Sequence, residues 1–497
     1  MARTLQTSGG MVTETSPKQP SVFQNWISMI GVVLSACALF AVLFLIALDL
    51  MASFENPYMG ILTYVVAPAF LTLGLLLVAG GALWERKRRH YLAPGEVPKY
   101  LRIDFNIPRH RNIFLIVTTV TAIFLLLTAF GSYQTYHFTE SVQFCGKTCH
   151  GVMHPEYTAY QNSPHARVAC AECHIGQGAG WFVKSKLSGS YQVYAVLANK
   201  YPRPIPTPIS NLRPAQETCE QCHWPQKFFG NAERVNRHFL ADTNNTPWTI
   251  ALLMKIGGGD PTHGPVGGIH WHMNVGNKVE YIASDESRQK IPWIRITDKD
   301  GKQTVFESED DKLKPEQIAA AAPRRVDCVD CHNRPAHNYN PPGKMVNIAM
   351  ATGRISTNLP NIKKLAVEAL TTEYATTDEA MKKIAEKVPA EVAPEVQKIY
   401  RQNFFPEMKV TWRAYPNNIG HTIFPGCYRC HDGKHKSADG KVITHDCNAC
   451  HTIIAQGSGE KLANISPKGL EFEHPVDIGD LWKEMNCADC HTGGLTQ

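Results

Sequence analysis

Cys145-Gly146-Lys147-Thr148-Cys149-His150 is the stretch that decides the architecture, because its pattern occurs seven times along the chain. In every copy two cysteines, separated by two or three residues, are followed directly by a histidine. The other copies are Cys170/Cys173/His174, Cys219/Cys222/His223, Cys328/Cys331/His332, Cys427/Cys430/His431, Cys447/Cys450/His451 and Cys487/Cys490/His491. Together they use 14 of the 15 cysteines, and the remaining one, Cys37, lies in an apolar run.

The chemistry of haem attachment explains this spacing. Two thiols add across the two vinyl groups of one haem, and the adjoining histidine turns back to coordinate the iron from one face. Zinc sites do not need a histidine directly after each cysteine pair, and thioredoxin-like motifs have no use for one. The sequence therefore predicts seven covalently bound c-type haems, with motif-side iron ligands at His150, His174, His223, His332, His431, His451 and His491. The first copy has an extra residue, so its loop must bulge slightly.

Composition limits what else the chain can contain. Its 32 prolines and 36 glycines indicate much irregular backbone, and only 9% of the residues are aromatic. We therefore expect the core of the soluble part to consist largely of haem. The formal charge of +6 does not indicate a nucleic-acid partner, because haem propionates offset it and many basic residues flank apolar segments.

Three apolar segments precede the first motif. Residues 26–48, 59–84 and 113–133 are each long enough to cross a bilayer, which takes about 20 residues. A cleaved signal peptide has a shorter apolar core and is not followed by further spans. The basic loop at residues 85–112 indicates the cytoplasmic side. The sequence thus predicts a protein of the cytoplasmic (inner) membrane, with its N-terminus and this loop in the cytoplasm and its haem domain in the periplasm.

The predicted fold has three N-terminal transmembrane helices and an extracytoplasmic multihaem domain, which is mainly helix and loop with a small β-rich insertion. The predicted parts are a disordered cytoplasmic tail (1–22), a membrane anchor (23–133), a three-haem module (134–224), a β-rich insertion ending in haem 4 (225–340), a helical spacer (341–405) and a C-terminal three-haem module (406–497). Strands are expected at residues 248–255, 268–275, 279–283, 291–297 and 303–307.

A helix is also expected over residues 181–197. Val183, Leu187, Tyr191, Tyr194 and Leu197 fall near one helical stripe, and basic residues lie off it. Aromatic and basic residues together suit a membrane surface. The alternative is that this helix packs on a haem.

A haem that only carries electrons is normally six-coordinate, so each iron needs a second ligand. Of the 21 histidines, seven are motif ligands, and His90 and His110 belong to the cytoplasmic side. The expected second ligands are His165, His272 (or His270), His337, His421, His435 and His474. His270 and His272 are treated as alternatives, one ligating and the other supporting. For each of these histidines the competing interpretation is a hydrogen bond to a propionate or to the backbone.

The run from Phe144 through Cys149-His150, Met153, Glu156-Tyr157, His165 and Cys170–His174 resembles the NapC/NirT/NrfH family of membrane-anchored quinol dehydrogenases. The resemblance covers roughly residues 134–224. The whole layout resembles the seven-haem inner-membrane cytochromes of metal-reducing bacteria, the ImcH type. Typical family members have one span and four haems, so residues 225–497 extend beyond the family core.

The resemblance implies that electrons enter from a quinol near the first haem. It implies that a methionine, here Met153, ligates that haem, although His154 follows His150 equally closely. It also implies a lysine and an acid at the quinol, which makes Lys184 or Lys186 the candidate lysine. Where the acid is expected, the chain has Tyr191 and Gln192, so Gln192 is the third quinol-site candidate.

The leading hypothesis is a membrane-anchored seven-haem cytochrome that passes electrons from menaquinol or another quinol to periplasmic cytochromes or a respiratory complex, in anaerobic or extracellular respiration. It is a quinol dehydrogenase in the electron-transfer sense, and no substrate-reducing haem is identified. One alternative is a multihaem reductase of a small oxyanion. Another is a pure relay that is fed by a membrane partner.

Overall fold

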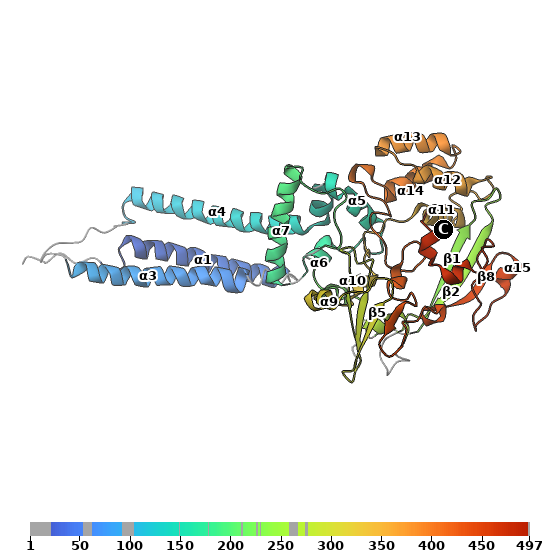
Figure 1. Ribbon diagram of the computed structural model, residues 1–497. Coiled ribbons are helices and arrows are strands. Elements are labelled where there is room, and N and C mark those ends of the chain that lie inside the picture. Colours follow the sequence, from blue (N-terminus) through green and yellow to red (C-terminus); the bar gives the residue numbers. More distant parts are fainter. Residues whose placement is uncertain are drawn as a thin grey trace, which may run out of the picture. The chain divides into compact units, whose positions relative to one another are not determined.

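A computed structural model describes residues 21–52, 62–91, 104–148, 150–176, 178–209, 212–224, 227–228, 230–257, 267–273 and 277–495 (Figure 1). Nearly all of the predicted tail, part of the basic loop and Cys149 lie outside the described residues. The chain divides into two compact units, Met1–His137 and Phe138–Gln497.

The first unit consists of long apolar helices. Its elements are α1 (Trp26–Ala52), the π-helical turn η1 (Leu62–Val66), α3 (Ala67–Arg89) and α4, which begins at Pro108 and ends at Glu140. Three of these helices are long and apolar enough to cross a membrane, with mean hydropathies of 2.8, 2.1 and 2.6. Large apolar side chains such as Leu76 and Phe124, 64% and 65% exposed, point away from the protein. This confirms the three predicted spans.

Helices α1 and α3 pack through small and polar residues. A Cβ on Gly74 would come within 2.7 Å of the Ser35 backbone, so the two helices approach closely. The Ser28 hydroxyl donates to the Val78 carbonyl at 3.0 Å, and the Asn25 amide donates to the Gly81 carbonyl at 3.0 Å. Small residues and interhelical hydrogen bonds hold membrane helices together where no hydrophobic driving force exists.

The second unit begins with the first motif. Its first elements are η2 (Phe144–Thr148), α5 (His150–Gln161), α6 (Cys170–His174), α7 (Ala179–Leu197) and α8 (Ala215–Cys219). The element η2 is a π-helical turn, which accommodates one more residue per turn than an α-helix. This is the predicted bulge of the first motif. Gly146 lies inside it, and a Cβ there would collide with the Tyr157 ring.

Two antiparallel sheets follow. The first has the order β1-β2-β8 and the second the order β6-β3-β4-β5-β7. The strands are β1 (Ala232–Phe239), β2 (Pro247–Met254), β3 (Lys278–Ile282), β4 (Trp293–Thr297), β5 (Gln303–Ser308), β6 (Arg324–Arg325), β7 (His435–Ser437) and β8 (His451–Gly457). Because β7 and β8 come from the C-terminal region, each sheet joins that region to the β-rich insertion.

The strand expected over residues 268–275 is not formed. Residues Ile269–Met273 form a 3-10 turn, η4. The ring of His270 bonds through Nδ1 to the Ile256 carbonyl at 2.9 Å, and that of His272 to the Ile269 carbonyl at 2.8 Å. Residues two apart in a 3-10 helix point in different directions, so these two histidines do not share a face as they would on a strand.

The largest side-chain core lies in a helical region. It comprises α11 (Pro342–Ala351), α12 (Ile362–Thr371), α13 (Thr377–Lys387) and α14 (Ala393–Asn403), which lie together in Figure 1. Val346, Ile362, Val367 and Val396 are fully buried there. The remaining elements are short: α9 (Pro315–Ala320), α10 (Cys328–Cys331), η5 (Pro406–Met408), η6 (Gly426–Arg429), η7 (Cys447–Ala449), α15 (Glu460–Ala463), α16 (Leu481–Glu484) and α17 (Cys487–Cys490).

Lys363 lies inside this core and makes stability depend on pH. Its side chain is 1% exposed, and its amine donates to the Gly343 carbonyl at 2.7 Å and to Asn347 Oδ1 at 2.6 Å. Burial lowers the pKa of Lys363 from 10.5 to about 7. Between these two values the unfolded chain binds more protons than the folded chain, so the free energy of unfolding rises with pH, by at most about 1.4 kcal/mol per unit.

We expect Lys363→Met to remove this rise. The Tm of the wild type should increase from pH 7 to pH 9 relative to that of the variant. Lys364→Met is the control, because the Lys364 side chain is 51% exposed. If the two variants show the same pH profile, the buried amine does not contribute.

Candidate haem sites and electron-entry surface

Each regular motif forms one tight helical turn. In four of them the backbone N–H of the motif histidine donates to the carbonyl of the first cysteine, at 2.8 Å for His223, 2.7 Å for His332, 3.0 Å for His431 and 2.8 Å for His491. Cysteines three positions apart on such a turn lie on one face. The histidine that follows is therefore held beside both thiols, as attachment of one haem requires.

The two cysteines of a motif differ in how far the chain encloses them. In four motifs the first cysteine is half-buried and the second is exposed, the exposed ones being Cys173, Cys222, Cys331 and Cys490. Cys222 therefore does not belong to a side-chain core. Exposure of this kind suits a thiol whose bonding partner is a group outside the polypeptide, as haem attachment requires.

Six motif histidines each face a second histidine. The ring centroids are 6.2 Å apart for His174 and His337, 6.1 Å for His223 and His165, 6.3 Å for His332 and His270, 5.8 Å for His431 and His272, 6.2 Å for His451 and His421, and 5.9 Å for His491 and His474. Imidazole nitrogens bind metals at about 2 Å. Two rings on opposite sides of one metal therefore have centres about 6 Å apart, so each pair fits an iron between its members.

Hydrogen bonds orient several of these rings. The Nδ1 atoms lie 3.2 Å from the Pro335 carbonyl for His165, 2.9 Å from that of Thr444 for His431, 3.0 Å from that of Glu156 for His337 and 2.7 Å from that of Val476 for His474. The rings of His270 and His272 bond in the same way in η4. A ring whose Nδ1–H donates to a carbonyl leaves Nε2 as its ligating nitrogen.

The pairing differs from the sequence-based expectation at two places. His270 and His272 are expected as alternatives, but in the structure each faces a different motif histidine. His435 faces none: it is 1% exposed, and its ring nitrogens lie 2.8 Å from Asp432 Oδ1 and 2.7 Å from the Ile291 carbonyl. With both nitrogens engaged, His435 holds β7 in place. The competing interpretation, a hydrogen bond to the backbone, therefore describes it better.

The first motif differs from the others. Met153 is half-buried on α5, three residues after His150 and thus one helical turn away. His154 packs edge-on against the Phe405 ring, with centroids 5.3 Å apart.

Motifs that are consecutive in the sequence also lie close together in space. Contact between the Cys145 and Cys170 thiols lowers the pKa of Cys170 to about 7, and contact with Cys328 lowers the pKa of Cys219 to about 6. Surrounding protein atoms raise the pKa of other motif thiols by displacing water, even for Cys173 and Cys331, which keep one side exposed. A thiol of an adjacent motif adds to the effect for Cys173 (near Cys219), Cys331 (near Cys427), Cys450 (near Cys427) and Cys487 (near Cys447). These proximities connect motif 1 to motif 7 without a gap.

Lys186 on α7 forms an ion pair with Glu140, the last residue of α4, and its amine lies 3.4 Å from Thr139 Oγ1. The two side chains are 35% and 17% exposed. The pKa of the Cys145 thiol is raised mainly by contact with the Cys170 thiol and by burial; the charge of Glu140 adds to this rise, and the charge of Lys186 opposes it. The pair therefore lies beside the first motif and is accessible.

The other quinol-site candidates lie differently. The amine of Lys184 lies over the Trp181 ring, 4.8 Å from its centroid. Gln192 is exposed and bonds only weakly, at 3.5 Å, to Ser188 on its own helix. The acid facing Lys186 is Glu140, which sequence reasoning missed. A usable signal exists, because Glu140 is the only acidic residue between Asp104 and Glu156.

The apolar stripe of α7 is exposed, with values of 56% for Val183, 69% for Leu187, 67% for Tyr191 and 83% for Leu197. An exposed apolar stripe on a helix with basic residues is typical of a membrane interface.

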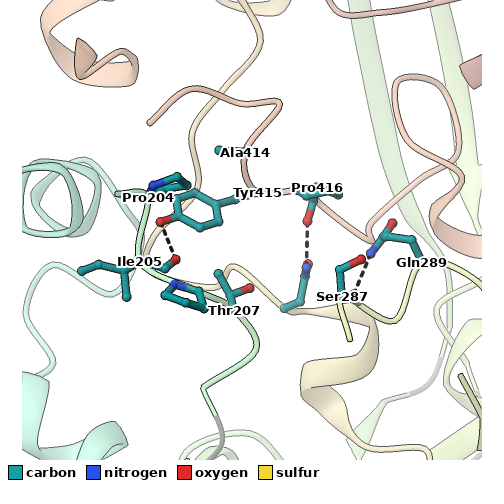
Figure 2. A pocket seen from close by; sticks show the side chains of 10 residues that line it. Pro204, Ile205, Thr207, Ser287, Gln289, Ala414, Tyr415 and Pro416 are labelled. Carbon is teal, nitrogen blue, oxygen red and sulfur yellow. Dashed lines mark hydrogen bonds between the residues drawn. The ribbon is translucent and has the colours of Figure 1, made fainter. Parts of the chain in front are cut away.

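A separate pocket of about 230 Å³ is lined by Pro204–Thr207, Ser287, Gln289, Asn333 and Ala414–Pro416 (Figure 2). The Tyr415 hydroxyl donates to the Ile205 carbonyl at 2.8 Å, and the Asn333 amide donates to the Pro416 carbonyl at 2.8 Å. Its lining residues include no lysine, arginine or histidine. The pocket therefore does not have the cationic lining that an oxyanion substrate requires.

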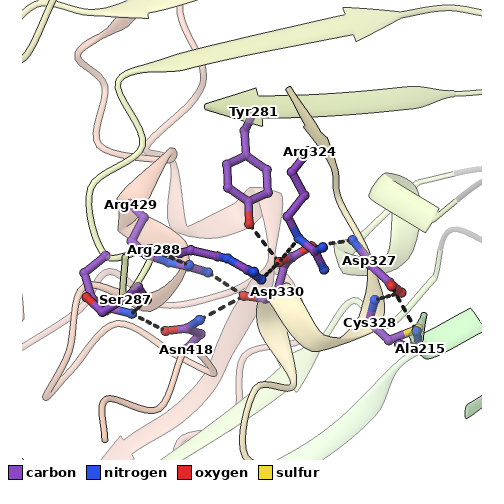
Figure 3. Close-up of polar contacts among 11 residues, drawn as sticks. Ala215, Tyr281, Ser287, Arg288, Arg324, Asp327, Cys328, Asp330, Asn418 and Arg429 are labelled. Carbon is purple, nitrogen blue, oxygen red and sulfur yellow. Dashed lines mark hydrogen bonds and ion pairs between the residues drawn. The ribbon is translucent and has the colours of Figure 1, made fainter. Parts of the chain in front are cut away.

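A buried carboxylate anchors the fourth motif (Figure 3). Asp330, 5% exposed, accepts hydrogen bonds at Oδ1 from the Tyr281 hydroxyl at 2.8 Å and from Arg324 Nε at 3.0 Å. Its backbone carbonyl accepts from Arg429 at 2.7 Å and from Asn418 at 2.9 Å. Because Arg429 lies inside the fifth motif, the network holds the fourth and fifth motifs against one another and against β3.

Facing imidazoles beside cysteine-pair turns, in a chain with three apolar helices, define a membrane-anchored multihaem c-type cytochrome. The model of the NapC/NirT cytochrome c family, N-terminal region, matches residues 108–204. The chain is 46% identical over 498 residues to the cytochrome c-type protein ImcH of Geobacter sulfurreducens, which covers 96% of this chain and 97% of that relative. No solved structure matches.

The chain therefore belongs to the NapC/NirT cytochrome c family, which confirms the resemblance seen in the sequence. Membership implies covalently bound haem iron, and together with the three apolar helices it indicates the inner membrane.

Proposed function

We propose that the chain takes electrons from the quinol pool and passes them through seven haems to periplasmic cytochromes or a respiratory complex. The observation that carries the proposal is the accessible Lys186–Glu140 pair beside the first motif. Glu140 lies seven residues past the apolar segment that ends at Tyr133, which is about 10 Å along a helix. That distance suits the level at which a quinol head group enters from the bilayer.

In this proposal the six facing histidine pairs hold haems 2 to 7, and His150 with Met153 serves the first. When bound, a c-type haem would supply a one-electron centre, and the facing histidines would be the residues that hold its iron. We take the order of transfer to follow the order of the motifs in the sequence, and the proximity of thiols in adjacent motifs supports this order.

The Lys186–Glu140 pair, which we call the entry pair, would take up the protons that the reaction releases. Oxidation of a quinol to a quinone releases two electrons and two protons. The carboxylate of Glu140 would accept the two protons one after the other, releasing the first to the surrounding water before it takes the second. The amine of Lys186 would hold that carboxylate in place and donate a hydrogen bond to the developing carbonyl oxygen. The electrons leave one at a time toward the first and second motifs, whose thiols Cys145 and Cys170 are in contact.

The distribution of positive charge supports one orientation of the protein in the membrane. The last turn of α3 carries Arg86, Lys87, Arg88 and Arg89, and positively charged segments stay in the cytoplasm. With α4 as the next span, Phe138–Gln497 would lie in the periplasm, where c-type haems are attached.

Rapid-mixing absorbance on the full chain in lipid nanodiscs tests the proposal. A menaquinol analogue is added, the reduced c-type α-band is followed, and dithionite gives the full amplitude. We expect the quinol to reduce a substantial part of that amplitude. No reduction, with full dithionite amplitude, would overturn quinol oxidation and leave a relay fed by a membrane partner. A high-spin ferric haem that binds nitrite or sulfite would instead favour the reductase.

A further inference from the structure

Glu156 lies next to a candidate iron ligand from a distant part of the chain. It is carried by α5, the helix that begins at His150, and it approaches His337, which follows the fourth motif. The Nδ1 of His337 lies 3.0 Å from the Glu156 carbonyl and 3.2 Å from the carboxylate oxygen Oε2. The Glu156 side chain is 14% exposed, and that of His337 is 27% exposed.

The position of this carboxylate is specific. Its Oε2 is buried and has no hydrogen bond within the described part of the chain, although it lies within ion-pair distance of His337. Tyr339 is also close to this carboxylate, and burial together with the charge of Glu156 raises the pKa of Tyr339. The described geometry of the carboxylate is its approach to the His337 imidazole, at 3.2 Å from Nδ1.

The other facing histidines have different surroundings. Five of the other facing histidines have a backbone carbonyl within hydrogen-bond distance of Nδ1. They are His165, His270, His272, His431 and His474. His337 differs from these five histidines in having a carboxylate oxygen, Oε2 of Glu156, within 4 Å of its Nδ1.

We propose that Glu156 is a positioning residue that makes His337 a stronger electron donor to the second haem and lowers the midpoint potential of that haem. A carboxylate beside the outer N–H of a ligating imidazole fixes the ring and increases the basicity of the ligating nitrogen. Its negative charge also favours the oxidised iron, which carries the greater positive charge. The inference rests on the proposed ligation of the second haem by His174 and His337.

The consequence concerns the first transfer step. Because Glu156 and His150 belong to the same helix, the segment that carries the first motif also sets the electrostatics of the second haem. A lowered midpoint potential of the second haem would make electron transfer from the first haem to the second less favourable. The transfer would then depend on onward transfer to later haems that are oxidised.

Spectroelectrochemical titration and low-temperature EPR of the full chain in nanodiscs test the inference. Glu156→Gln keeps the size of the side chain and the backbone carbonyl but removes the charge. We expect one of the seven redox components to shift to higher potential, and one low-spin signal to change its g values, with the haem content unchanged. Glu391→Gln is the control, because Glu391 is exposed and lies in the helical region before α14.

A second variant separates the ligation from the role of Glu156. His337→Met should raise one component, since thioether ligation raises a haem potential, and Glu156→Gln should add nothing on that background because a thioether has no N–H. If His337→Met leaves every component unchanged, the proposed ligation fails. If His337→Met shifts one component and Glu156→Gln shifts none, or shifts several with loss of haem, the inference about Glu156 is overturned while the ligation stands.

Discussion

Reduction of the haems by menaquinol is expected to be about 100-fold slower in a Glu140→Gln variant, because a positioned proton acceptor contributes about 10²–10⁴ to a rate. Glutamine retains the shape of the side chain but does not take up the proton that a quinol hydroxyl must lose. The measurement is the rate of the α-band increase after mixing with a menaquinol analogue in nanodiscs. Reduction by dithionite should be unchanged.

Lys186→Gln should slow the same reaction, since it removes the ion-pair partner of Glu140. The effects of the two substitutions should be less than additive, because contacting residues act as a unit. Lys184→Gln is the matched control: Lys184 lies two residues away, but its amine lies over the Trp181 ring. Equal slowing by Lys184→Gln and Lys186→Gln would contradict the assignment of the entry pair and indicate a general surface-charge effect.

Local signals explain what the sequence could predict. Haem attachment needs two cysteines and a histidine within five or six residues, so all seven motifs are visible in the sequence. A membrane span needs a continuous apolar run, so the three helices are equally visible. The π-helical turn Phe144–Thr148 follows from the one extra residue of the first motif. None of these features depends on a distant part of the chain.

The pairing of histidines depends on tertiary structure and was only partly predictable. His174 meets His337, and His272 meets His431, across more than 150 residues. A list of spare histidines therefore contains the partners but not their assignment. The prediction for His270 and His272 was wrong in its local structure, because a strand was expected where η4 forms. For His435 a local signal existed in Asp432, three residues earlier, to which its ring is bonded.

The acid of the candidate entry site shows the same limit. The family pattern points to α7, close in sequence to Lys184 and Lys186, where the chain has only Tyr191 and Gln192. The structure instead brings Glu140 to Lys186 from the end of α4. Family resemblance places a residue by its neighbours in sequence, whereas an ion pair requires only proximity in space. The acid that pairs with the lysine can therefore lie on a different element, far from it in the sequence.

Asp330→Ala is expected to destabilise the second unit by about 3 kcal/mol, because removing one partner of a buried ion pair leaves the other charges uncompensated. The substitution removes the acceptor of Tyr281 and Arg324, and also of Arg288, whose guanidinium lies 3.4 Å from Oδ1. The estimate is at the lower end of the usual range because Arg324 and Arg288 are 36% and 29% exposed.

Asp489→Ala is a closely matched control. Asp489 occupies the same position in the seventh motif, directly before the second cysteine, but it is exposed. Its carboxylate accepts a backbone hydrogen bond from Asn486 at 3.1 Å, and no arginine contact is described for it. Thermal unfolding followed by haem absorbance should therefore show a lower Tm for Asp330→Ala and a change within about 0.5 kcal/mol for Asp489→Ala.

The comparison isolates the carboxylate of Asp330 from its backbone. Arg429 and Asn418 bond to the carbonyl of Asp330, which the alanine variant retains, so the link to the fifth motif survives the substitution. What is lost is the attachment of the fourth motif to β3 and to Arg324 on β6. If both variants unfolded at the wild-type temperature, the fourth motif would have to be held mainly by its haem and by the backbone bonds, and the buried network would contribute little.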